Sequence, residues 1–166
     1  MEISTSQARR VRRKGTLRSW RTIRKTKVQE KMEHKMEHIN PKGLFKSPAF
    51  SQVVTTHGSG KTIYIGGQNG VNENAELVGK GDLAKQCEQI MQNLKIALES
   101  CGASFANLVK LNINLLYGQD ARKGFEVSQR FLGEIPNQPA ITVLFVSGFV
   151  NPEYLIEIDA IAFVPD

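Results

Sequence analysis

Cysteine and long apolar runs are scarce in this chain of 166 residues, and both shortages exclude classes of protein. Its two cysteines, Cys87 and Cys101, lie fourteen residues apart on one expected helix, which separates them by about 21 Å. Disulfide-bonded Cα atoms lie within about 7 Å of each other, so these two cysteines cannot bridge within one chain. Two free thiols are typical of a protein in a reducing compartment.

Apolar stretches are short throughout the sequence. None approaches the roughly 18 residues of a membrane-spanning helix, and the amino terminus lacks the apolar stretch of a secretory signal. We therefore expect a cytoplasmic protein with no membrane partner. His34 and His38 have the i, i+4 spacing of helical metal ligands, but without a further ligand on a rigid element they predict no metal site.

Basic residues are concentrated at the amino terminus. Residues 1–35 hold 12 of the 22 Lys and Arg residues but 3 of the 16 Asp and Glu residues, which is a net charge of +9. The remainder of the chain carries −3, so the net charge of +6 belongs to the basic segment. A mildly acidic domain argues against a nucleic-acid-binding face, and we expect nucleic acid to contact the basic segment at most.

Residues 1–38 are interpreted as a basic extension, either disordered or not native, and residues 39–166 as the folded domain. Three explanations of the extension stay open. It is Arg-rich and acid-poor like a mitochondrial transit peptide, or it is an electrostatic arm for an anionic partner. It is otherwise translated upstream sequence, because Met32 and Met36 both begin the tripeptide Met-Glu-His. We favour the upstream sequence, then the transit peptide.

The first half of the domain predicts two strands and a helix. Residues 50–57 and 61–65 are strand-like and flank His57-Gly58-Ser59-Gly60, which is typical of a β-hairpin. Asp82 is a good N-cap for a helix whose apolar residues recur at helical spacing as far as Cys101. Gly102 then occupies the C′ position that ends many helices.

The second half predicts a helix and three strands. Residues 109–115 alternate apolar and polar, residues 121–132 form a shorter helix with Phe125 and Leu132 directed inward, and the apolar run 141–146 favours a central strand covered on both faces. In the last strand, 154–163, Glu157 and Asp159 share one face about 7 Å apart. The predicted fold is α+β in the order β-β-α-β-α-β-β, one sheet with two helices on one face.

Five segments recur in the same order in one known family. They are Phe50-Ser51-Gln52, Gly66-Gly67-Gln68, Cys101-Gly102-Ala103-Ser104, Pro139-Ala140 and the run 156–162. On these segments the chain resembles, from about Ile39 to Val164, the RidA family, also called YjgF or endoribonuclease L-PSP. The resemblance implies a chorismate-mutase-like fold and a homotrimer with clefts between subunits for a small-molecule ligand. It also implies hydrolysis of 2-iminobutanoate and 2-iminopropanoate to 2-oxo acids and ammonia, without metal or coenzyme.

The resemblance also assigns site residues. Glu157 matches the acidic residue that positions or activates water, and Gly67 with Gln68 matches the family's hydrogen-bonding segment. Phe50 stands where the family has a tyrosine, and Ile141 stands where it has the arginine that holds the substrate carboxylate. Phe125 falls near the position of the family's asparagine. An isoleucine supplies neither the charge nor the paired hydrogen bonds of that arginine.

We therefore expect a cofactor-independent deaminase that hydrolyses a reactive imine, enamine or similar small metabolite, which need not carry a carboxylate. Glu157 would orient water, Gly67 and Gln68 would supply hydrogen bonds, and Phe50 and Ile141 would form an apolar wall. Two alternatives stay open: a non-catalytic trimer that binds a small metabolite, and a ribonuclease.

Overall fold

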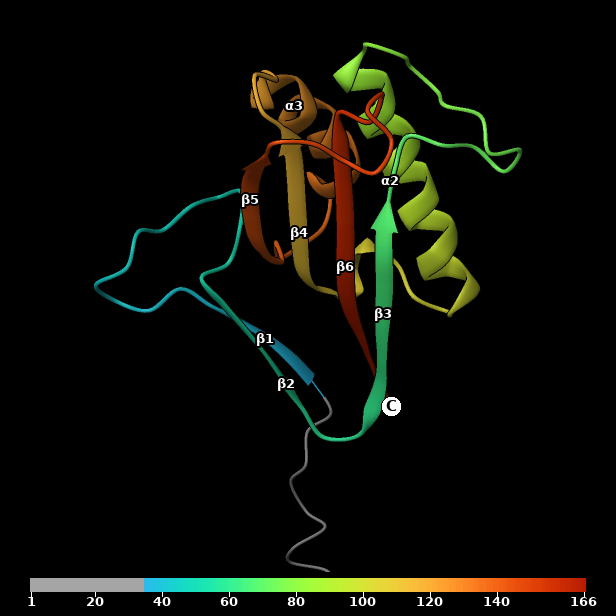
Figure 1. Ribbon diagram of the computed structural model, residues 1–166. Coiled ribbons are helices and arrows are strands. Elements are labelled where there is room, and N and C mark those ends of the chain that lie inside the picture. The colour runs from blue at the N-terminus through green and yellow to red at the C-terminus, as the bar shows by residue number, and fades with distance from the viewer. Residues whose placement is uncertain (1–34) are drawn as a thin grey trace, which may run out of the picture. The chain divides into compact units, whose positions relative to one another are not determined.

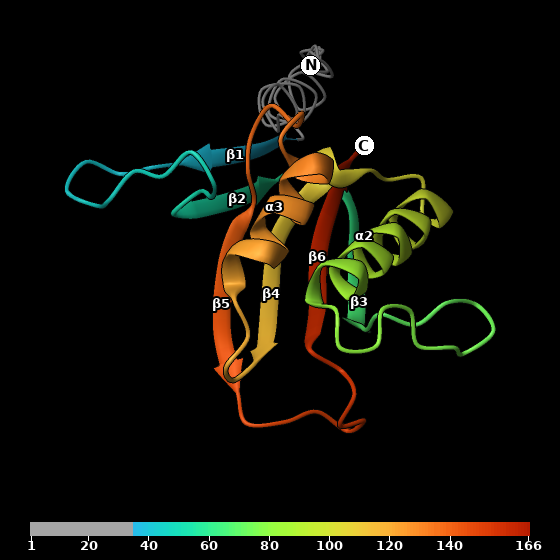
Figure 2. The same cartoon turned by 90° about the horizontal axis from the view of Figure 1, so that it is seen from above.

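Two sheets and two α-helices make up residues 35–166, the part of the chain that the computed structural model describes (Figure 1). The elements are β1 Lys35–Ile39, β2 Val53–His57, β3 Gly60–Gln68, α2 Leu83–Ser100, the short 3-10 helix Phe105–Asn107, β4 Leu108–Leu116, α3 Ala121–Leu132, β5 Ala140–Val146 and β6 Ile156–Pro165. The main sheet has the order β3-β6-β4-β5, with β4 and β5 parallel and the other neighbours antiparallel. Both helices lie on one face of it (Figures 1 and 2), which confirms the predicted α+β class.

Helix α2 begins and ends as its sequence predicts. The Asp82 side chain accepts hydrogen bonds from the backbone N–H groups of Ala84 and Lys85, which would otherwise have no partner. Gly102 has a φ of 70°, and its N–H donates to the carbonyl of Glu99 in the manner of a Schellman motif. Both cysteines are free; Cys87 is buried, whereas Cys101 at the C-cap is only partly buried. No helix within residues 35–166 is long and apolar enough to cross a membrane.

Helix α3 faces the sheet with one stripe of buried residues. Its buried positions are Gly124, Val127, Ser128 and Leu132, so the inward direction of Leu132 is confirmed. Phe125 is 51% exposed and is not buried as expected, although it borders a cavity between α3 and the sheet. It lies at the edge of the buried stripe, about 20° around the helix from Leu132, because seven residues make almost two turns.

The two central strands separate apolar from polar side chains as predicted. Leu111 and Ile158 are each 1% exposed and face the helices. Asn112 lies opposite Asp159 and Asn114 lies opposite Glu157 on the other face, which no helix in residues 35–166 covers. Because neighbouring residues in register share a face, these four side chains form one group, called the polar face below.

Strand β5 is an edge strand, so the prediction of a central strand covered on both faces was wrong. Val143, Leu144 and Phe145 are 50%, 55% and 53% exposed. A continuous apolar run indicates that both faces of a strand avoid water, but it cannot say whether the cover comes from the same chain.

The predicted hairpin between residues 50–57 and 61–65 does not form. Strand β2 pairs instead with β1, and the β1–β2 sheet stands apart from β3 in Figure 1. Residues 35–38, assigned from the sequence to the extension, lie in β1 and add a strand to the predicted order. Hydrogen bonds to the carbonyl of Gln138 from Ser51 Oγ (2.6 Å) and His38 Nδ1 (2.9 Å) attach this sheet to the segment before β5.

Candidate active site

The polar face holds two carboxylates in different surroundings. Asp159 Oδ1 accepts a hydrogen bond from Asn112 Nδ2 at 2.8 Å, across neighbouring strands. Lys110, two residues before Asn112 on β4, donates a hydrogen bond to the Thr142 hydroxyl on β5. These contacts give Asp159 and Lys110 hydrogen-bond partners within the sheet, whereas the hydrogen-bond donor to Glu157 comes from outside it.

Glu157 lies directly against the backbone of Gly67. A Cβ placed on Gly67 would stand 2.7 Å from both Cδ and Oε1 of Glu157, a distance that real Cβ atoms do not reach. The close approach arises where the β3–β6 register shifts between Ile65 and Gln68, so the backbone bends toward the carboxylate. A side chain at position 67 would force the Glu157 carboxylate to move away, which is a physical reason for the Gly66-Gly67-Gln68 segment.

Asn69 completes the surroundings of Glu157, and sequence reasoning missed it. Its Nδ2 donates to Glu157 Oε2 at 3.2 Å, while its own Oδ1 is buried without a hydrogen-bond partner among residues 35–166. Glu157 Oε1 likewise has no donor within the described part of the chain. The asparagine directly after Gln68 was a possible signal, but the sequence does not reveal the register shift that turns it toward β6.

The Gln68 side chain makes no hydrogen bond to this carboxylate within residues 35–166. Its Nε2 donates to the carbonyl of Gly66 at 3.0 Å, and the residue lines an open, polar groove of about 760 Å³. Asn93 of α2 holds the far wall of that groove through hydrogen bonds from Nδ2 to the carbonyls of Asn69 and Val71, at 3.3 and 2.9 Å. The structure thus places Gly67 against Glu157, whereas the Gln68 side chain, in register with Ile158, turns toward α2.

Phe50 and Ile141 lie on the other side of the sheet. Ile141 is in register with Leu111, whose side chain faces the helices, whereas Thr142 is in register with Asn112 of the polar face. Both predicted wall residues line a cavity of about 360 Å³ between α3 and the sheet, and Phe125 is at the same cavity. Within one chain, Glu157 with Gly67 therefore lies on one face and Phe50 with Ile141 on the other, while Gln68 lines the groove beside α2.

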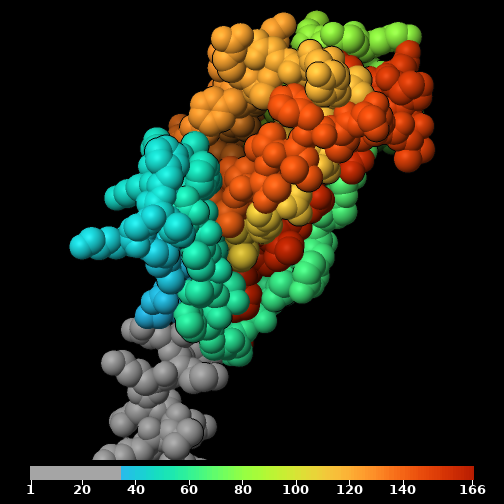
Figure 3. Space-filling view, turned by 60° about the vertical axis from the view of Figure 1, so that its left-hand side comes forward, coloured from blue at the N-terminus to red at the C-terminus, as the bar shows by residue number. Residues whose placement is uncertain are grey.

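The cavity, called the apolar cavity below, is closed at its floor by nearly fully buried side chains. The floor residues are Cys87, Met91, Leu111, Ile156 and Ile158. The segment that supplies Phe50 runs beside β5, as Figure 3 shows for residues 40–57 in cyan and teal next to residues 140–146 in orange.

Cys87 at that floor is not suited to act as a nucleophile. Burial raises the pKa of its thiol to about 12, so the thiolate is negligible at neutral pH. Its Sγ donates to the carbonyl of Gly124 at 3.5 Å. The thiol therefore serves as a small apolar group.

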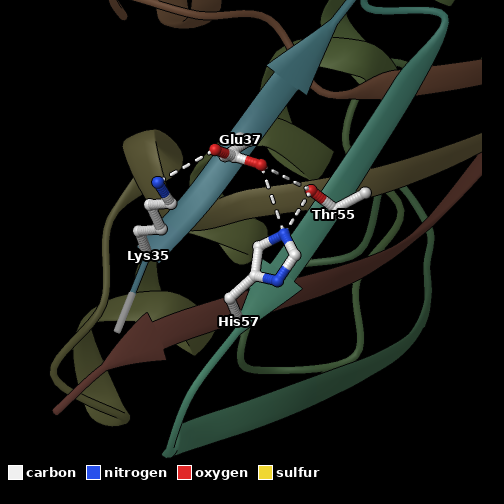
Figure 4. A network of polar contacts seen from close by, with 4 residues as sticks. All are labelled: Lys35, Glu37, Thr55 and His57. Carbon is white, nitrogen blue, oxygen red and sulfur yellow. Dashed lines mark hydrogen bonds and ion pairs between the residues drawn. The ribbon is translucent and has the colours of Figure 1, made fainter. Parts of the chain in front are cut away.

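A second cluster of reactive side chains joins β1 to β2 (Figure 4). Glu37 contacts Lys35 at 3.0 Å and His57 Nε2 at 3.2 Å, and the same Nε2 lies 3.0 Å from Thr55 Oγ1. A nucleophile–base–acid relay needs the acid and the nucleophile on different ring nitrogens, so this cluster cannot work as one. The hydrogen bond and charge of Lys35 lower the pKa of the exposed Glu37 carboxyl. The cluster is a cross-strand polar contact.

No group of three or more His, Cys, Asp or Glu residues suited to a metal ion occurs among residues 35–166.

Comparisons with known proteins cover the described domain. The sequence model of the family described as endoribonuclease L-PSP matches residues 44–164. A RutC family protein of Pyrococcus abyssi is 33% identical over 104 residues, which are 63% of this chain and 80% of that protein. The 2-iminobutanoate/2-iminopropanoate deaminase of Rattus norvegicus is 30% identical over 115 residues, 69% of this chain and 79% of that enzyme. A crystal structure of YyfB, a Rid-family protein of unknown function from Yersinia pestis, has a TM-score of 0.70 and 34% identity over 78% of this chain and 98% of that chain.

Proposed function

We propose that this chain, which belongs to the endoribonuclease L-PSP or RidA family, hydrolyses the imine or enamine form of a small metabolite. The rat relative is named for deamination of imino acids, and that name supports the reaction class. The proposal for this chain rests on one observation, the placement of the Glu157 carboxylate between Gly67 and Asn69.

The reaction needs a positioned water and a group that accepts its proton. Glu157 Oε2 is held by Asn69, and Oε1 has no donor among residues 35–166, so Oε1 is available to accept a hydrogen bond from water. The water oxygen would add to the imine carbon while Glu157 takes the proton. Glu157 then returns that proton to nitrogen, which gives a carbinolamine. The hydroxyl proton of the carbinolamine passes to nitrogen, again through Glu157, as the C–N bond breaks and the C=O bond forms, which yields a carbonyl compound and ammonia. Such acid–base assistance contributes roughly 10²- to 10⁴-fold to a rate.

We further propose a homotrimer in which a cleft between two copies completes the site. The uncovered polar face and the half-exposed side chains of Val143, Leu144 and Phe145 support burial against other copies, because single chains rarely leave such rows open. Light scattering of the full chain should give a mass near three times 18.5 kDa. A monomer at micromolar concentration would contradict both the assembly and a site between subunits.

The catalytic proposal is tested by Glu157→Gln, with Asp159→Asn as the matched control on the same face. Turnover is followed as ammonia release from imines generated in solution, including neutral ones. We expect a loss of at least about a hundredfold in kcat for Glu157→Gln and a change of less than about threefold for Asp159→Asn, since Asp159 is engaged with Asn112. Equal activity in the two variants would refute the role of Glu157.

The non-catalytic alternative has its own supporting observation, since Ile141 and Phe125 make the ligand cavity apolar where the family resemblance implies polar residues. Binding of a small ligand without turnover by any tested imine would favour that alternative. RNA cleavage that persists after removal of residues 1–34 would favour the ribonuclease instead.

A further inference from the structure

The apolar cavity lies on the opposite face of the sheet from Glu157. Its lining residues indicate which chemical groups a ligand could place there. Three side chains at its mouth, Phe50, Phe125 and Ile141, are apolar, and its floor is buried and apolar as described above. In another protein an apolar cavity of about 150 Å³ stays dry and binds benzene, so about 360 Å³ accommodates a ring-sized group.

Two of the polar groups around the cavity already have hydrogen-bond partners within the chain. Ser128 Oγ donates to the carbonyl of Phe125 at 3.0 Å, and Cys87 Sγ donates to the carbonyl of Gly124. A water needs two to four polar partners, and these groups leave few for it. Gln129 is an exception, because its carboxamide has no partner among residues 35–166, and it supplies an uncharged hydrogen-bonding group.

Arg122, a cation among the lining residues, forms an ion pair with Asp120. Arg122 donates from Nε to Asp120 Oδ1 at 3.0 Å and from Nη2 to Asp120 Oδ2 at 2.9 Å. The hydrogen bonds to Asp120 raise the pKa of Arg122, and those from Arg122 lower the pKa of Asp120. Arg130, further along α3, pairs with Glu88 at 3.6 Å. A ligand carboxylate would therefore meet an arginine whose charge Asp120 already balances, or would lose its hydration without compensation.

Gly124 keeps the cavity open although no close contact requires a glycine there. A Cβ at this position would meet only Ile156 Cδ1, at an ordinary 3.9 Å. Glycine destabilises a helix relative to alanine, so a glycine on this face of α3 maintains space at some cost to the fold.

From these observations we infer that the apolar cavity binds an uncharged apolar or aromatic group of the ligand and discriminates against a carboxylate. The inference rests on the proposed function only in assigning that ligand as the substrate of imine hydrolysis. Since the cavity and Glu157 of one chain face opposite ways, the bound group would present its reacting carbon to Glu157 of a second copy.

The test compares two probes of similar size, indole and indole-3-acetate, by titration calorimetry with the full chain. We expect indole to bind at least tenfold more tightly than indole-3-acetate. Gly124→Leu should weaken indole binding at least tenfold by filling the cavity, whereas Gly124→Ala should change it less than threefold. Val143→Phe, at the half-exposed mouth, provides the same test if Gly124→Leu does not fold.

Glu157→Gln separates this inference from the proposed reaction. Unchanged indole binding in that variant supports the cavity as a binding site even where turnover is absent in every protein tested. Tighter binding of indole-3-acetate, no indole binding, or indole binding that neither cavity-filling variant weakens would overturn the inference. Imine turnover that is lost in Glu157→Gln would still support the reaction in that case.

Discussion

The polar face and the apolar cavity lie on opposite sides of the same strands but are constrained in different ways. On the polar face, Gly67 and Glu157 are in such close contact that a Cβ at position 67 would force the carboxylate to move. At the cavity, a Cβ on Gly124 would meet only Ile156 Cδ1, at 3.9 Å, so a larger side chain has room. Ile141 and Phe125, which line this cavity, differ from the residues that the family resemblance implies. If the proposed roles hold, the comparison indicates that the carboxylate proposed to activate water is in place while the residues proposed to select the ligand differ from the family resemblance.

The largest effect expected from this difference is that of Gly67→Ala. Its Cβ would displace the Glu157 carboxylate, and a displacement of about 1 Å at a reacting group costs on the order of a hundredfold in rate. Gly66→Ala is the matched control, because a Cβ there has nothing within 4 Å. Steady-state imine hydrolysis by the two variants checks this prediction, and similar rates would mean that the close approach has no catalytic role.

Ile141→Arg should convert the cavity from neutral to carboxylate ligands. We expect the natural protein to hydrolyse 2-iminobutanoate poorly and the variant to gain roughly tenfold, since a hydrogen bond to a charged group contributes about 1.5–3 kcal/mol. The gain would be partial because Phe50 and Phe125 remain.

Folding of Ile141→Arg must be verified by thermal melting, since an unpaired charge in an apolar site costs a few kcal/mol. Ile141→Met is the control of similar volume. Efficient deamination of 2-iminobutanoate by the natural protein, abolished by Glu157→Ala, would show that another cation holds the carboxylate.

Cys87 tests whether the cavity floor excludes water. Its pKa of about 12 is above that of an unfolded cysteine, near 8.5, so the folded state retains a proton that the unfolded state loses between these values. This contribution to stability is complete below about pH 8.5 and declines as pH rises, by up to about 1.4 kcal/mol per pH unit. Denaturant unfolding at pH 8 to 10 should show a steeper decline for the natural protein than for Cys87→Ala. Parallel declines would mean that water reaches the thiol.

Gly124→Ala should have the smallest effect and the opposite sign. With room for the methyl group and a better helix former, the free energy of unfolding should rise by about 0.5–1 kcal/mol, a few degrees in melting temperature. Scanning calorimetry measures the rise. A fall would indicate that α3 packs more tightly on the sheet than the 3.9 Å contact suggests.

The features that could be predicted depend on residues close together in the sequence. Asp82 and Gly102 define the ends of α2 through bonds within a few residues, and strand alternation alone put Glu157 and Asp159 on one face. Asn69 could not be found in this way, because its contact with Glu157 depends on a register shift between β3 and β6.

The sequence by itself determined the ends of α2 and the faces of the central strands, because each depends on local spacing. The tertiary structure alone decided that β2 pairs with β1, that β5 is at an edge, and that Ile141 faces the helices away from Glu157. Pairing partners and register are set by contacts between distant segments, and a shift of one residue would turn Ile141 to the opposite face.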